Sequence, residues 1–257
     1  MELDDAYANA AHIPGGADYP DRWAGQAAAF RSAARCELDL DYGETDRLRF
    51  DLFHPDRLAR GVVIFVHGGY WLRFDKSFWS HLAAGPLAQG WAVAMPSYDL
   101  CPKAGIAQIG DQIARAIDVI ARRVPGPVRL VGHSAGGQLV ARVMAPRDGA
   151  DWQQRVACVV PVSPVTDLAP LMRTSMNKDL GITPAIAQAE SPVHLPPPPC
   201  PVTVWVGGAE RPVFLEQADL LAQAWAAPLV TVPERHHFDV IEDLGLPDSD
   251  LTRAVLA

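Results

Sequence analysis

The sequence predicts an α/β protein with a mostly parallel sheet of eight strands and helices on both of its faces. Along the 257 residues, short apolar runs alternate with longer segments that have helical periodicity. Some of these runs, above all residues 61–69, are apolar at nearly every position, which is typical of strands covered on both faces. We find no internal repeat, and we expect one domain over residues 1–257.

The first half of the chain is expected to supply four strands. Residues 1–35 indicate a loop and a short helix that lie over the domain. The segments CELDLDYG and RLRFDLFHP alternate apolar and polar residues around ETD, which predicts an antiparallel hairpin over residues 36–55. Two apolar strands are expected at residues 61–69 and 91–100, separated by a helix over residues 78–90 that Gly90 would close.

The second half continues the alternation of strands and helices. Isoleucines recur in steps of three and four from Ile106 to Ile120 and form one stripe, which predicts a helix over residues 106–124. Further strands are expected at residues 127–134, 156–163, 201–208 and 228–234, with helices over residues 135–145, 213–225 and the C-terminus. Residues 166–199 are irregular, end in four prolines and are expected to form a small cap or insertion.

Composition and charge exclude several kinds of function. The formal net charge is −8 and lysines and arginines form no stripe, so neither nucleic acid nor a membrane is an expected partner. The acidic first ten residues lack an apolar signal core, and we expect a cytoplasmic protein. Cys36, Cys101, Cys158 and Cys200 lack zinc spacing and H-E-x-x-H does not occur, so we expect free thiols and no metal site.

A serine between glycines follows the apolar run that begins at residue 127. Residues 132–136 read GHSAG and match the pattern G-x-S-x-G, with a strand predicted before it and a helix after it. Such a sharp strand-to-helix turn needs small neighbours, because larger side chains two residues away would collide. The turn also aims the N-terminus of the helix at the serine oxygen. Ser134 is therefore the candidate nucleophile; an incidental serine in a glycine-rich turn is the alternative.

A serine hydroxyl is a weak nucleophile until a base takes its proton. In the order typical of this motif, an acid and then a histidine follow the serine. PERHHFDV, after the last expected strand, holds His236 and His237, and sequence alone does not separate the two. Glu210 follows the preceding strand and would hold the imidazole in the correct tautomer. A helix-capping role is the alternative for Glu210, and Asp167 is the competing acid.

Two glycines at the end of a buried strand are candidates for binding an oxyanion. In VHGGYW, Gly68 and Gly69 would let main-chain N–H groups approach a substrate with no Cβ in the way. Together with the N–H group of Ala135 they would form an oxyanion hole. A plain tight turn is the alternative, but it does not account for the pairing with the serine motif.

With these motifs the sequence resembles proteins of the α/β-hydrolase fold and, among them, the kynurenine formamidase (arylformamidase) group. The resemblance covers most of the chain and is carried by HGGYW at 67–71, GHSAGG at 132–137, GGAE at 207–210 and HHFDVIEDL at 236–244. GHSAGG is common to many esterases and is specific only for the fold. HGGYW is more telling, because many lipases and esterases have a third glycine where this chain has Tyr70.

The resemblance implies Ser134 as nucleophile, His237 as base and Glu210 as acid, although better-known members use aspartate as the acid. It implies hydrolysis of N-formyl-kynurenine to kynurenine and formate through an acyl-enzyme, with no cofactor. Tyr70 and Trp71 would bind the aryl ring of the substrate, or they would belong to the core.

Two other functions fit the same residues. A general short-chain carboxylesterase would use the same machinery, because a triad does not name its substrate. A non-catalytic ligand-binding protein on a hydrolase scaffold would usually lack the serine or the histidine, and this chain keeps both. The expected partner is a small-molecule substrate. The sequence does not decide whether the protein forms a homodimer.

Overall fold

The computed structural model describes all 257 residues, and its centre is one eight-stranded sheet in the order β1-β2-β4-β3-β5-β6-β7-β8. The antiparallel pairs are β1–β2 and β2–β4, and all other pairs are parallel. The strands are β1 (Cys36–Asp41), β2 (Arg49–Phe53), β3 (Val62–Val66), β4 (Ala92–Pro96), β5 (Val128–His133), β6 (Val156–Val162), β7 (Val204–Gly207) and β8 (Leu229–Val232). The predicted class, a mostly parallel sheet of eight strands, is confirmed.

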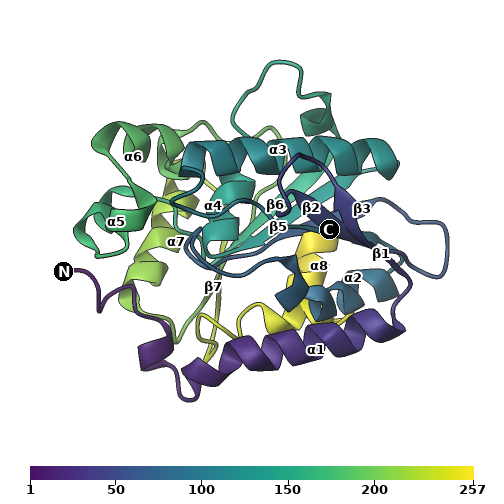
Figure 1. Ribbon diagram of the computed structural model, residues 1–257, viewed down its shortest axis with the longest axis horizontal. Coiled ribbons are helices and arrows are strands. Elements are labelled where there is room, and N and C mark those ends of the chain that lie inside the picture. Colours follow the sequence, from purple (N-terminus) through teal and green to yellow (C-terminus); the bar gives the residue numbers. More distant parts are fainter.

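Eight α-helices surround the sheet, and both of its faces are covered (Figure 1). They are α1 (Tyr19–Ala33), α2 (Ala84–Ala88), α3 (Ile106–Arg123), α4 (Ala135–Arg142), α5 (Asn177–Leu180), α6 (Pro184–Glu190), α7 (Pro212–Trp225) and α8 (Asp250–Leu256). Short 3-10 helices lie at Ala10–His12, Gly16–Asp18, Lys76–Phe78, Ser80–Ala83, Asp151–Arg155, Ala169–Arg173, Pro192–His194 and Glu242–Gly245. No helix is long and apolar enough to cross a membrane.

The core consists of two apolar layers separated by the sheet. In β3, Ile64 packs in the layer formed with α3, α4 and α7, whereas Val63 and Phe65 pack in the layer formed with α1 and α8. Successive side chains of a strand point to opposite faces, so a strand between two layers must be apolar at every position. All five residues of β3 are buried for this reason.

The isoleucine stripe forms the buried face of α3. Ile106, Ile109, Ile113, Ile117 and Ile120 are all at most 2% exposed. The helix ends at Arg123, and Val124 is already extended, because the residue before a proline disfavours the helical conformation. Prediction and structure agree here to within one residue.

Two predicted helices differ from the structure. The helix within residues 1–35 is 15 residues long rather than short, and it buries Tyr19, Trp23 and Ala27 at steps of four. The helix expected over residues 78–90 is divided between 3-10 turns and an α-helical part, which is only α2. Pro86 has no N–H group to bond to a preceding turn, so the α-helix begins only two residues before it.

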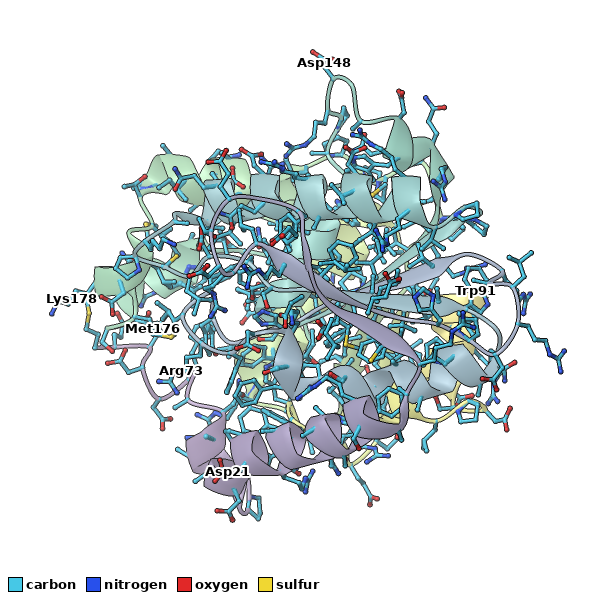
Figure 2. All side chains as sticks on the ribbon, turned by 45° about the vertical axis from the view of Figure 1, so that its right-hand side comes forward. Asp21, Arg73, Trp91, Asp148, Met176 and Lys178 are labelled. Atoms are coloured by element: carbon cyan, nitrogen blue, oxygen red, sulfur yellow. The ribbon has the colours of Figure 1, made fainter.

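Residues 166–199, expected as a cap or insertion, connect β6 to β7 and contain α5, α6 and two 3-10 helices. In Figure 1 these helices lie on the same side of the molecule as the N-terminus and α7. This side is the carboxyl edge, by which we mean the edge of the sheet where the parallel strands end. Figure 2 shows Arg73 and Met176 on this side, and Trp91, just before β4, on the opposite one.

Candidate active site

Ser134 lies in a strained turn between β5 and α4. It has φ 56° and ψ −118°, a conformation that a residue with a Cβ rarely adopts. Such a conformation costs roughly 1–3 kcal/mol and persists only where the surroundings enforce it. Here the N–H group of Ser134 donates to the carbonyl of Val162 in β6 (2.8 Å), which fixes the turn against the next strand.

The glycines on either side of Ser134 allow three backbone segments to meet. A Cβ on Gly132 would lie 2.2 Å from the carbonyl oxygen of Gly136. A Cβ on Gly136 would lie 2.0 Å from the carbonyl oxygen of Val66, the last residue of β3. Both distances are far below van der Waals contact, so no residue larger than glycine fits while the turn keeps this geometry.

The HGGYW segment forms a second turn beside the first. A Cβ on Gly68 would lie 2.9 Å from the Cβ of Ser134, so the two turns are in close contact. Gly69 has φ 109°, and the N–H groups of Gly68 and Gly69 donate to no other group of the protein. Ala135 is the first residue of α4, where the N–H groups of a helix have no intrahelical acceptor. These are the amides from which the sequence predicts an oxyanion hole.

His237 and Glu210 form a buried pair. Nδ1 of His237 lies 2.6 Å from Oε2 of Glu210, and both side chains are at most 3% exposed. The other carboxylate oxygen of Glu210 accepts from the N–H group of Gly207 (2.9 Å) and from the hydroxyl of Ser163. Three donors thus compensate for the loss of water around this carboxylate.

The alternative base and the alternative acid lie elsewhere. Nε2 of His236 bonds the hydroxyl of Tyr19 (3.1 Å), and its Nδ1 lies 3.1 Å from Asp239. Oδ1 of Asp167 accepts from the N–H group of Ala169 (2.9 Å), with no bond to either histidine. The structure therefore brings Glu210 together with His237 and leaves His236 and Asp167 outside the pair.

His133 connects the turn at Ser134 to the loop that holds His237. Its Nε2 lies 2.8 Å from the carbonyl oxygen of His237, and the two imidazole rings are 4.8 Å apart. Because a carbonyl only accepts, Nε2 of His133 carries the proton. Burial, with a smaller contribution from the nearby His237, holds the pKa of His133 well below 6.5, so this ring stays neutral.

No hydrogen bond joins the side chains of Ser134 and His237 in this structure. The ring of His237 bonds Glu210, and the side chain of Ser134 makes no capping bond to α4. Both residues are 3% exposed, and Ser134 follows His133 directly. Bonds between catalytic groups are often long without substrate and shorten when it binds, so this geometry is compatible with a nucleophile and its base.

The two predicted aryl-binding residues have different surroundings. Trp71 is fully buried and belongs to the core, which favours the second of the two interpretations for this residue. Tyr70 is only partly buried, and its hydroxyl donates to the carbonyl of Tyr7 (2.8 Å). Of these two residues, only Tyr70 is accessible from outside the core.

Sequence reasoning did not find every residue of this site. Ser163, which bonds Glu210, directly follows β6, and its position at the carboxyl edge is the signal that could have found it. Tyr7 also contacts the site, because its ring packs edge-on against Phe214 (5.9 Å), whose ring lies 4.2 Å from that of His237. Tyr7 is the first residue of the stretch YANAAHIP, but the sequence assigns it no role in the site.

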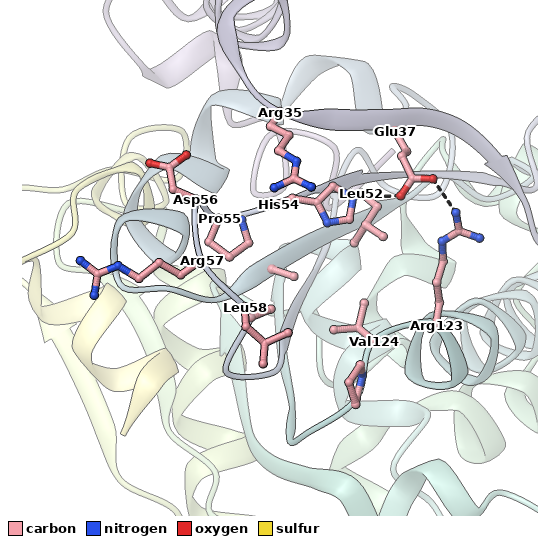
Figure 3. A pocket seen from close by; sticks show the side chains of 13 residues that line it. Arg35, Glu37, Leu52, His54, Pro55, Asp56, Arg57, Leu58, Arg123 and Val124 are labelled. Carbon is pink, nitrogen blue, oxygen red and sulfur yellow. Dashed lines mark hydrogen bonds and ion pairs between the residues drawn. The ribbon is translucent and has the colours of Figure 1, made fainter.

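A surface cavity of about 630 Å³ lies away from these residues (Figure 3). Its lining includes Ala92 and Val124, which lie where strands begin rather than where they end. Within it, the carboxylate of Glu37 bonds His54 (2.9 Å) and Arg123 (2.5 Å). This cavity is therefore at the edge of the sheet opposite the candidate site.

Comparison with protein families decides the class of the protein. Residues 63–192, just over half of the chain, match a protein family whose description is "alpha/beta hydrolase fold". This range includes both turns described above. The chain belongs to the α/β-hydrolase family. A catalytic triad and an oxyanion hole are typical of this fold, and the predicted family resemblance is confirmed.

Curated relatives are similar to this hydrolase over most of its length. A kynurenine formamidase of Drosophila melanogaster is 30% identical over 241 residues, which cover 83% of this chain and 78% of that protein. A kynurenine formamidase of Salmo salar is 28% identical over 247 residues, which cover 88% and 83% of the two chains. Family and relatives together show that the chain is a hydrolase enzyme.

Two solved structures resemble the hydrolase. A candidate thioesterase from a Silicibacter species superposes with a TM-score of 0.98 at 54% identity, and the match covers 100% of both chains. Esterase B from Lactobacillus rhamnosis superposes with a TM-score of 0.67 at 19% identity and covers 93% of this chain and 92% of its own. The second likeness shows the fold alone.

The glycine contacts yield a first prediction. Gly136→Ala should lower the free energy of unfolding by at least ~2 kcal/mol, because its methyl group would overlap the carbonyl of Val66. Gly110→Ala is the matched control in α3, where a Cβ meets nothing within 4 Å. The control should raise the stability by up to ~1 kcal/mol. Urea unfolding measures both, and equal effects would contradict the close contact.

The buried imidazole of His67 yields a second prediction. It stacks on Tyr98 (4.3 Å), and burial lowers its pKa from 6.5 to about 4. Below pH 6.5 the unfolded chain therefore binds a proton that the folded protein excludes, and the free energy of unfolding decreases as the pH falls toward 4.

Between pH 7.5 and pH 5, this one residue should lower the free energy of unfolding by about 2 kcal/mol. His67→Gln, which keeps a donor for the carbonyl of Gly68, should remove that part of the decrease. Urea unfolding at the two pH values measures the difference. An identical decrease in both proteins would exclude His67 as its source.

Proposed function

We propose that this hydrolase is a serine hydrolase that cleaves small aryl formamides, with N-formyl-kynurenine as the representative substrate. The observation that carries the proposal is the convergence of Ser134, the Glu210–His237 pair and the turn at Gly68 and Gly69 on the carboxyl edge of one sheet. The kynurenine formamidase names of relatives that match over most of the chain support the substrate class.

In the proposed reaction, Nε2 of His237 removes the proton from Ser134 as Oγ attacks the formyl carbon. Glu210 keeps Nδ1 of His237 protonated and stabilises the imidazolium that forms. The negative charge moves to the carbonyl oxygen, where the N–H groups of Gly68, Gly69 and Ala135 bind it. One such donor is worth on the order of 3 kcal/mol in the transition state.

The second half of the reaction releases the amine and then the acid. His237 gives its proton to the leaving nitrogen, the C–N bond breaks and a formyl ester remains on Ser134. A water molecule, deprotonated by His237, then attacks this ester and releases formate. An aryl amine leaves more readily than an alkyl amine, so this machinery suits an aryl formamide.

Thioesters and short-chain esters are the second candidate substrates. The candidate thioesterase at 54% identity favours a thioester, and the fold supports many acyl transfers with the same three side chains. All of these reactions would use Ser134 in the same way and would differ only in the group that leaves.

The nucleophile is tested by Ser134→Ala. We expect activity below ~1% of the wild type with an unchanged melting temperature, because loss of this residue type costs several orders of magnitude. Ser32→Ala, an exposed serine whose hydroxyl bonds only the carbonyl of Ala29, is the matched control and should keep full activity.

Labelling with a fluorophosphonate, read by mass spectrometry, should add one adduct to the wild type and none to Ser134→Ala. A folded wild type that takes no label would favour a non-catalytic binding protein. Labelling at another serine would move the nucleophile.

The substrate is tested by comparing kcat/KM on three acyl donors. These are N-formyl-kynurenine, p-nitrophenyl acetate and acetyl-coenzyme A, measured on the same preparation. We expect the formamide to exceed both by about tenfold or more, which corresponds to roughly 1.4 kcal/mol of transition-state discrimination. Parity between the formamide and the ester would favour the general carboxylesterase, and a leading thioester would favour the thioesterase.

A further inference from the structure

The turn that carries the oxyanion-hole glycines contains an unusual run of strained residues. Gly69, Tyr70 and Trp71 have φ values of 109°, 54° and 57°, in the region that favours glycine. Gly69 adopts such a conformation at little cost, but Tyr70 and Trp71 do not. Other parts of the protein must therefore hold these two residues in place.

Each of the two residues is held by a different partner. Trp71 is fully buried, and its carbonyl accepts from the N–H group of Cys101 (2.8 Å). Tyr70 is held through its hydroxyl, which donates to the carbonyl of Tyr7 (2.8 Å), a residue 63 positions away near the N-terminus. Burial raises the pKa of Tyr70 well above 10, so this hydroxyl stays protonated and can donate throughout the neutral range.

Residues 2–9, which we call the strap, are anchored to the loops at the carboxyl edge. The N–H group of Leu3 donates to the carbonyl of Arg173 (3.3 Å), and Asp4 accepts from the N–H group of Ser175 (2.6 Å). Asp5 pairs with Arg211 (2.7 Å). The strap therefore lies across the segment after β6 and the start of α7.

Tyr7 joins the strap to both halves of the site. Its hydroxyl accepts from Nε2 of Gln217 (3.3 Å), and its ring packs on Phe214, which contacts His237. Its carbonyl binds Tyr70, which follows the oxyanion-hole glycines. One residue of the strap thus touches the neighbours of the base and of the oxyanion hole.

We propose that Tyr70 is a positioning residue. Through its bond to Tyr7 it holds the turn at residues 68–71 in its strained conformation, so that the strap contributes to the activity of the site. The inference rests on the proposed serine mechanism. Without the bond, Tyr70 relaxes toward ordinary dihedral angles, and the adjoining N–H group of Gly69 turns away from the position of the oxyanion. Those donors act mainly in the transition state, so the loss falls on kcat rather than on KM.

Tyr70→Phe tests the proposal, because it removes only the hydroxyl. On the best substrate of the panel above, we expect kcat to fall about tenfold and KM to change by less than about twofold. The inhibition constant of phenylboronic acid, whose adduct with a serine places an oxygen in the hole, should rise about tenfold in parallel. A purely structural role would lower stability without this shared change.

Tyr42→Phe is the matched control. Its hydroxyl also donates to a buried carbonyl, that of Ser97, but it lies outside the site. We expect a comparable loss of stability in the two variants, with kcat unchanged in Tyr42→Phe. Equal losses of kcat in both would overturn the positioning role.

A double-mutant cycle tests whether Tyr70 acts through the strap. Tyr7→Ala removes the contacts with Phe214 and Gln217 and should lower kcat about as much as Tyr70→Phe. If the strap carries the effect, adding the second substitution should change kcat by less than about twofold. Fully multiplicative losses would overturn the role of the strap. If Tyr7→Ala does not fold, Glu2→Gln with Asp5→Asn detaches the strap more mildly, through its pairs with Arg173 and Arg211.

The two proposals fail separately. If fluorophosphonate labels Ser134 but Tyr70→Phe keeps the wild-type kcat, only the inference about the strap is wrong. If the folded wild type takes no label at Ser134, the serine mechanism itself is wrong.

Discussion

The contact that the rest of the site depends on is the one between the end of β3 and the first turn of α4. The parallel pairing of β3 with β5 runs from Val62 and Val128 to Val66 and Gly132, so both strands finish at the same level. Gly136 then packs so tightly on Val66 that a methyl group does not fit between them. This contact sets the turn with Gly68 beside Ser134, and without it the proposed nucleophile and the proposed oxyanion donors would lie apart.

The remaining groups reach this place because neighbouring strands end there too. Glu210 follows β7, His237 follows β8, and Ser163 follows β6. Their mutual bonds are buried, where electrostatic interactions are strong and unpaired polar groups are costly. A carboxylate with three donors is rigid in such surroundings, and it fixes which way the imidazole of His237 faces.

Four of the eight non-glycine residues with positive φ lie where the chemistry is proposed. Ser134, Ser163, Tyr70 and Trp71 all have positive φ, and all four follow strands at the carboxyl edge. Each costs roughly 1–3 kcal/mol, which the well-packed layers on both faces of the sheet can offset. The surroundings that enforce the strain are distant in sequence, and for Tyr70 they include the N-terminal strap.

The sequence alone determined what depends on local pattern. The isoleucine stripe predicted α3 to within one residue, and glycine spacing with the apolar run at residues 127–134 predicted the strand, turn and helix around Ser134. Local pattern could not choose between His236 and His237, because both occupy the same loop with the same chemistry. The bond between Glu210 and His237 joins residues 27 positions apart, and the bond between Tyr70 and Tyr7 joins residues 63 positions apart. The burial of Trp71 likewise depends on segments that are distant in the sequence. Only tertiary packing decides such contacts, because the free energy that selects them comes from surfaces that are brought together by the fold and not by neighbouring residues in the chain.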